Sequence, residues 1–100
     1  MAILHIIARH LNAVELSKLV DRSGAEDAYA FMDDGVYVLL SKHLTEFSAR
    51  SVYVLAQHGH ERGLTEDKND QVQFIEMSDL VSLTALYPTS VSWWYAIRNR

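Results

Sequence analysis

Short apolar runs alternate with amphipathic stretches along this chain, and that alternation limits the possible folds more than any other feature. The run Ala2–Ala8 (AILHIIA) is nearly continuous in aliphatic residues, as is typical of a parallel strand covered on both faces. Three further runs, rich in β-branched or aromatic residues, also predict strands: Ala28–Met32, Ser51–Ala56 and Val72–Met77. The sequence therefore predicts an α/β fold with a small, open, mainly parallel sheet flanked by helices.

The first helix is expected soon after the first strand, because local signals mark both of its ends. Asn12 offers an N-cap oxygen, and Glu15 stands three residues later, as in a capping box. Leu11 and Leu16 occupy the two positions of a hydrophobic staple. Gly24 is placed to end the helix in a left-handed conformation.

The segment after the second strand is predicted to form one helix over residues 36–47. Five of its residues recur at helical spacing and should face the sheet: Val36, Leu39, Leu40, His43 and Phe47. Tyr37 and Leu44 should then face elsewhere. His43, on an apolar stripe, is interpreted as a partly buried, hydrogen-bonded residue.

Further along the chain, polar residues predict a loop over Glu61–Asp70. Ser78 can cap a last helix, with Asp79 in its first turn and Pro88 as its stop. The remaining tail, Val91–Arg100, contains both tryptophans.

The composition is that of an ordinary globular protein and excludes thiol chemistry. A chain of 100 residues is long enough for one domain, which we place at residues 1–100. Hydrophobic residues make up 49% of the chain and charged residues 22%, so disorder is not expected. The sequence contains no cysteine, so the chain itself can form no disulfide, thiolate metal site or persulfide.

Charge and motifs argue against binding of nucleic acid, nucleotides or membranes. Nine Lys and Arg against 13 Asp and Glu give a formal net charge of −4, without the clustered cations that bind phosphate backbones. The glycines at positions 24, 35, 59 and 63 fit no phosphate-binding glycine motif. For that reason we expect no cofactor. The apolar N-terminus is too short for a signal or membrane segment, so we expect a cytoplasmic protein.

Ligands usually bind beyond the carboxyl ends of parallel strands, which directs attention to the loops Arg9–Asn12, Asp33–Val36 and Gln57–Leu64. In the third loop, His58, His60 and Glu61 carry the atoms that bind zinc or nickel. A helical turn would point the two imidazoles about 200° apart, however, and a solvated loop is the favoured interpretation.

Two other polar features have a functional and a structural interpretation. Asp33 and Asp34 could form an acid/base pair, but adjacent turn residues rarely converge, so capping before Gly35 is favoured. His5, inside the first strand, is interpreted as structural.

An aromatic group near the C-terminus is a candidate interface, because aromatic residues are enriched at the centres of protein interfaces. Its members are Tyr87, Trp93, Trp94 and Tyr95. The alternative is that these side chains close the core, and the sequence does not decide between the two.

Several motifs, in their order along the chain, resemble the DsrE/DsrF/DsrH sulfur-relay superfamily. Asp34-Gly35-Val36, directly after the strand AYAFM, is similar to the strand-Asp-Gly-Val element of that superfamily. The strand VYVLA, Arg62-Gly63-Leu64 and VQFIEM resemble segments of its smallest branch, TusB/DsrH. The later residues resemble that branch still more: Asp79-Leu80-Val81, Leu83-Thr84, Pro88 and Trp93 or Trp94.

The resemblance implies a noncatalytic subunit of a sulfurtransferase complex that serves 2-thiouridine synthesis at tRNA wobble positions. A TusD/DsrE-like sister chain would carry the persulfide cysteine, and a TusC/DsrF-like chain would pack beside it. Some DsrH-type members have a cysteine near the N-terminal loop, where this chain has Arg9–Asn12, and this difference favours TusB over DsrH. Residues Tyr95–Arg100 extend past the usual tryptophan ending.

Three alternatives remain open from the sequence. The first is a DsrH-like subunit in sulfur oxidation. The second is a stand-alone enzyme or metal-binding protein that uses His58, His60 and Glu61. The third is a self-associating regulatory domain that forms a homo-oligomer.

Overall fold

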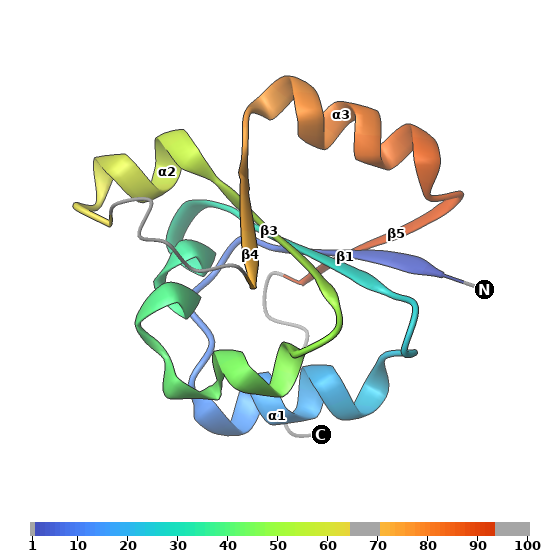
Figure 1. Ribbon diagram of the computed structural model, residues 1–100, viewed down its shortest axis with the longest axis horizontal. Helices are drawn as coiled ribbons and strands as arrows, with labels where there is room; N and C mark the ends of the chain where they lie inside the picture. The colour runs from blue at the N-terminus through green and yellow to red at the C-terminus, as the bar shows by residue number, and fades with distance from the viewer. Residues whose placement is uncertain (1, 65–70, 94–100) are drawn as a thin grey trace.

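The computed structural model describes residues 2–64 and 71–93, which contain a five-stranded, all-parallel open sheet flanked by helices (Figure 1). The strands are β1 (Ile3–Ile7), β2 (Ala28–Phe31), β3 (Ser51–Leu55), β4 (Val72–Ile75) and β5 (Thr89–Trp93). Their order across the sheet is β4-β3-β2-β1-β5, and every neighbouring pair is parallel. The predicted fold class is confirmed.

The helices divide unequally between the two faces of the sheet. They are α1 (Ala13–Arg22), the 3-10 helices η1 (Asp33–Leu40) and η2 (Lys42–Phe47), α2 (Ala56–Glu61) and α3 (Met77–Leu86). Figure 1 shows α1 and the two 3-10 helices on one side and α3 on the other. Among the described residues, no helix has the length and apolar character needed to cross a membrane.

Each face of the sheet buries its own apolar cluster, because neighbouring strand residues point to opposite faces. Under α1 and the 3-10 helices, Tyr29 and Phe31 of β2 each contact Phe47 edge-on, with ring centroids 4.9 and 5.9 Å apart. Under α3, β2 contributes Ala28 and Ala30 instead. Strand β2 is therefore buried on both faces, with large side chains on one and small ones on the other.

The capping box predicted for α1 is present. The Glu15 N–H donates to Asn12 Oδ1 and the Asn12 N–H donates to Glu15 Oε1, each at 2.9 Å. The predicted end is wrong in detail, because Gly24 is not left-handed. Instead, the Ser23 hydroxyl donates to the carbonyls of Leu19 and Val20 at 2.9 and 3.0 Å and ends the helix there.

The single helix predicted over residues 36–47 is wrong, because the chain forms η1 and η2 with a break at Ser41. The Ser41 hydroxyl accepts the His43 N–H at 3.1 Å and starts the second 3-10 helix. With three residues per turn instead of 3.6, a different set of side chains faces inward. Leu40 is consequently 71% exposed and Leu44 only 5% exposed, the reverse of the prediction.

Three other elements differ from the sequence prediction. Strand β5 was not predicted, because its alternate serines weaken the apolar pattern. It pairs in parallel with the edge of β1 that β2 leaves free. Helix α2 replaces the first part of the loop expected at Gln57–Leu64. Helix α3 begins at Met77, before the expected cap Ser78, and the Asp79 carboxylate accepts the Glu76 N–H at 2.9 Å.

The predicted turn at Asp34-Gly35-Val36 lies where η1 crosses the end of β1. A Cβ atom on Gly35 would lie 2.2 Å from the Ile7 carbonyl oxygen, far inside van der Waals contact. Gly35 does not have a positive φ; the left-handed residue of the turn is Asp33, with a φ of 46°. Glycine is therefore required by the close approach of two backbone segments rather than by its own backbone conformation.

Gly35→Ala should lower the free energy of unfolding by about 1 to 3 kcal/mol, because β1 and η1 must separate to admit one methyl group. Denaturant unfolding followed by circular dichroism measures this change. Gly59→Ala is the matched control, since its Cβ would meet nothing closer than 3.5 Å. Equal stability of the two variants would contradict the close approach.

Candidate functional site

The carboxyl edge of the sheet gathers residues that follow three neighbouring strands. His10, after β1, has its ring centroid 5.6 Å from that of Tyr37 in η1, which follows β2. The η1 residue Asp34 accepts a hydrogen bond of 3.0 Å from Nε of Arg62, which follows α2. The three loops singled out by topology thus meet in space, through the ring contact between His10 and Tyr37 and the ion pair between Asp34 and Arg62.

Asp33 and Asp34 do not converge as an acid/base pair. The Asp33 N–H donates to His58 Nδ1 at 2.8 Å, and its carboxylate lies 3.5 Å from the same nitrogen. The hydrogen bond that Arg62 donates to the Asp34 carboxylate raises the pKa of the Arg62 guanidinium above its ordinary value. The Asp33 N–H and the Asp34 carboxylate therefore hold α2 against η1 through different partners.

The structure separates the candidate metal ligands His58, His60 and Glu61 instead of joining them. All three lie on or at the end of α2, where residues two apart point about 200° apart. His58 lines a small cavity beside Met77, whereas His60 and Glu61 line an open hollow beside Glu76. Within residues 2–64 and 71–93, no group of three His, Cys, Asp or Glu side chains is arranged to hold a metal ion.

A buried polar chain joins the first, second and fifth strands. His5 and Asp27 are 4% and 3% exposed, and His5 Nε2 lies 2.7 Å from Asp27 Oδ2. The Trp93 indole N–H donates to His5 Nδ1 at 2.9 Å. Because Nδ1 accepts, the neutral ring carries its proton on Nε2 and donates it to Asp27. His5 is therefore structural, as expected.

Asp27 was not identified from the sequence, although a carboxylate directly before a buried strand was a usable signal. Burial by itself raises the pKa of Asp27, but three hydrogen bonds outweigh burial and hold the pKa below its ordinary value. They come from His5, from the Ile3 N–H at 2.9 Å and from the Gly24 N–H at 3.0 Å. The carboxylate is thus kept ionised inside the fold.

Tyr87 and Trp93, the described members of the proposed aromatic patch, lie on opposite faces of the sheet. Trp93 packs against the cluster beneath α1, with its ring tilted against His5 at a centroid distance of 5.8 Å. Tyr87 packs against the α3 cluster, where burial raises the pKa of its hydroxyl. Trp94 and Tyr95 lie outside the described residues. The described members of the predicted interface therefore do not form a continuous surface.

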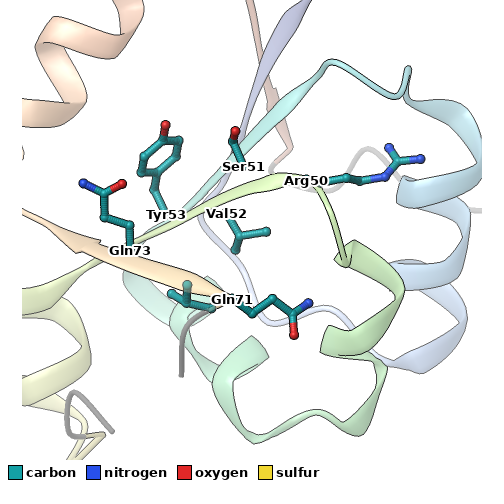
Figure 2. Close-up of a pocket in the computed structure, with 7 residues that line it drawn as sticks. Arg50, Ser51, Val52, Tyr53, Gln71 and Gln73 are labelled. Atoms are coloured by element: carbon teal, nitrogen blue, oxygen red, sulfur yellow. The ribbon is translucent and has the colours of Figure 1, made fainter. Parts of the chain in front are cut away.

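A hollow of about 160 Å³ lies at the opposite, amino-terminal ends of β3 and β4. Figure 2 shows the residues that line it. The Arg50 side chain points toward α1, away from Gln71 and Gln73. Its Nη1 atom donates to Tyr29 Oη at 2.6 Å and to the Gly24 carbonyl at 3.0 Å. Among the described residues that line this hollow there are two neutral amides, Gln71 and Gln73, but no carboxylate or imidazole.

Comparison with known proteins shows the family to which this chain belongs. The model of the family described as DsrH like protein matches residues 10–90. The chain belongs to the DsrH-like family. Within the broader TusB/DsrH group, it is 29% identical over 94 residues to Protein TusB of Pectobacterium parmentieri, covering 90% of this chain and 99% of that protein.

The fold also matches a solved structure. The solution NMR structure of protein Tm0979 from Thermotoga maritima aligns with a TM-score of 0.62 at 24% identity. The alignment covers 85% of this chain and 92% of the other, and it supports the α/β fold alone. The DsrH-like match agrees with the resemblance inferred from the strand motifs, and no residue of the chain is a cysteine.

Asp27→Asn should destabilise the fold by about 2 kcal/mol or more, because it removes a buried charge that three donors satisfy. The lowered pKa of Asp27 means that its contribution is complete above the ordinary Asp pKa of about 4 and is lost as pH falls through the folded-state value. The wild-type free energy of unfolding should therefore fall in acid more steeply than that of the variant. Urea titrations at several pH values measure this difference.

Glu46→Gln is the control for Asp27→Asn. Glu46 also accepts a hydrogen bond from a histidine, His43, but it is exposed to solvent. Loss of an exposed pair should leave stability near that of the wild type. Identical acid dependence in wild type and Asp27→Asn would contradict the role of the buried pair.

Proposed function

We propose that this chain is the noncatalytic, TusB-like subunit of a cytoplasmic sulfur-relay complex that supports 2-thiouridine synthesis at tRNA wobble positions. The observation that carries the proposal is DsrH-like family membership over residues 10–90 in a chain without cysteine. The relative named Protein TusB, aligned over 99% of its length, supports TusB over a DsrH-like role in sulfur oxidation.

The chemistry of the carboxyl edge supports a noncatalytic role. Sulfur relay requires a thiol that accepts sulfane sulfur and passes it on. At this edge the chain presents His10, Tyr37, His58 and the Asp34–Arg62 ion pair, none of which can form a persulfide. Persulfide sulfur would therefore be carried by a TusD/DsrE-like sister chain, with a TusC/DsrF-like chain completing the complex.

The first test of this proposal is persulfide loading. When the purified complex is incubated with a cysteine desulfurase and cysteine, we expect intact-mass spectrometry to find one added sulfur on a sister chain. This chain should gain none, because it has no thiol. Treatment with a reductant should remove the added mass and serves as the control. A stable gain of one sulfur on this chain would remove the noncatalytic assignment.

The second test is assembly and pathway. Co-expression with TusC-like and TusD-like chains of the same genome should yield one complex on size-exclusion chromatography. The gene should also restore thiolated wobble uridine in a strain that lacks its own TusB, measured by mercury-gel electrophoresis of tRNA. A complex that forms without restoring thiolation would favour sulfur oxidation. A chain that stays alone and binds stoichiometric metal would favour the His58, His60 and Glu61 alternative.

A further inference from the structure

We infer that His5 is a proton-operated latch for the carboxyl end of β5: the neutral ring holds Trp93, and protonation of the ring releases it. The latch begins with a histidine that is buried in the sheet and has a partner on each ring nitrogen. The change lies within this chain, so it does not depend on the proposed function.

The two partners of the His5 ring place different demands on it. The Asp27 carboxylate, 2.7 Å from Nε2, accepts the proton of that nitrogen whether the ring is neutral or charged. The Trp93 indole can only donate, and its nitrogen lies 2.9 Å from Nδ1, so it requires the lone pair that Nδ1 has in the neutral ring. An imidazolium therefore keeps Asp27 as its partner but turns a second donor toward the Trp93 N–H.

Burial of His5 does not prevent uptake of this proton, because a carboxylate is already in place. Hydrogen bonds hold the pKa of Asp27 below its ordinary value and keep it ionised, so an imidazolium at His5 forms a buried ion pair without net charge. Histidine is also the side chain that ordinarily changes its charge between about pH 5 and 8. Asp27 stays ionised throughout that range.

The other groups that face the ring do not bring a second charge against it. Tyr29 of β2 stacks on His5, with ring centroids 5.2 Å apart and planes 14° apart. The Tyr29 hydroxyl accepts from Arg50 Nη1 at 2.6 Å, so the guanidinium is bonded to the tyrosine rather than to the imidazole. Helix α1 covers this face with its buried leucines. Among the described contacts of the ring, Asp27 is therefore the charged one.

Trp93 is the partner that gives way on protonation, because the other side of the pair is fixed more firmly. His5 lies in β1, between β2 and β5, and Asp27 accepts two backbone N–H groups besides the imidazole. In the described sheet, β5 is an edge strand paired with β1 alone, and the Trp93 side chain is only partly buried. Trp93 lies opposite Ile7 in the register, so its release uncovers the carboxyl end of β1.

The experiment follows His5 and Trp93 in one pH titration of the whole chain. NMR of ¹⁵N-labelled histidine reports the protonation state of His5, and acrylamide quenching reports the exposure of Trp93 in a Trp94→Phe background, where it is the single tryptophan. Between about pH 8 and 5 the imidazolium should form, and the quenching constant should rise about twofold or more with the same midpoint. Far-UV circular dichroism should stay constant, because Asp27 remains ionised.

Two variants separate the latch from a purely structural contact. Trp93→Phe keeps an aromatic ring but has no N–H to oppose the imidazolium, so by linkage His5 should take up its proton at a pH about half a unit to one unit higher. His5→Gln has no titrating ring and should abolish the pH dependence of quenching. His43→Gln is the matched control, because His43 also contacts a carboxylate, that of Glu46, but its side chain is 37% exposed. The transition should be unchanged in this control.

Each other outcome overturns the latch. If His5 becomes an imidazolium while quenching of Trp93 stays constant, the indole does not leave. If His5 keeps one protonation state from about pH 8 to 5, no proton operates the contact. A rise in quenching that persists in His5→Gln assigns the change to another group. If His5→Gln does not fold, Trp93→Phe decides, and a midpoint that is unchanged or lowered contradicts the latch.

Discussion

The buried carboxylate of Asp27 is the constraint on which the centre of this fold depends. A charge removed from water is tolerated only when donors replace its hydration, and here His5 and two backbone N–H groups do so. Because His5 also accepts the Trp93 indole N–H, one polar chain links the start of β2 to β1 and to the end of β5. Within the described residues, no buried side-chain polar atom lacks a partner.

The two faces of the sheet differ in the size of the side chains that they bury. Large rings on one side, Tyr29, Phe31 and Phe47, fill the space beneath α1 and the 3-10 helices. On the other side, Ala28 and Ala30 provide little bulk, and a single helix covers them. The described residues therefore form a thicker helical layer on one face of the sheet and a thinner one on the other.

The carboxyl edge of the sheet shows that the architecture of a fold does not by itself fix the chemistry of its loops. Function resides in particular side chains rather than in the fold, and this edge carries ion pairs and ring contacts where a sulfur carrier requires a thiol. Gly35 still brings η1 against the Ile7 carbonyl, so the backbone framework of the edge is intact. In this chain, the contacts between these loops join η1 to α2 and to the segment after β1.

The sequence by itself determined the features that depend on neighbouring residues. The apolar runs placed four strands, and the spacing of Asn12 and Glu15 placed the start of α1, because strand burial and helix capping act over a few residues. The absence of cysteine excluded a thiol role at any position.

Only the tertiary structure decided what depends on distant contacts. Strand β5 forms because β1 offers a free edge, and η1 and η2 replace one α-helix beside that packed sheet. The tertiary structure also pairs His5 with Asp27, 22 residues away, and places Tyr87 and Trp93 on opposite faces of the sheet. Local patterns carry no information about such contacts, because the free energy that selects them arises only when segments distant in sequence meet.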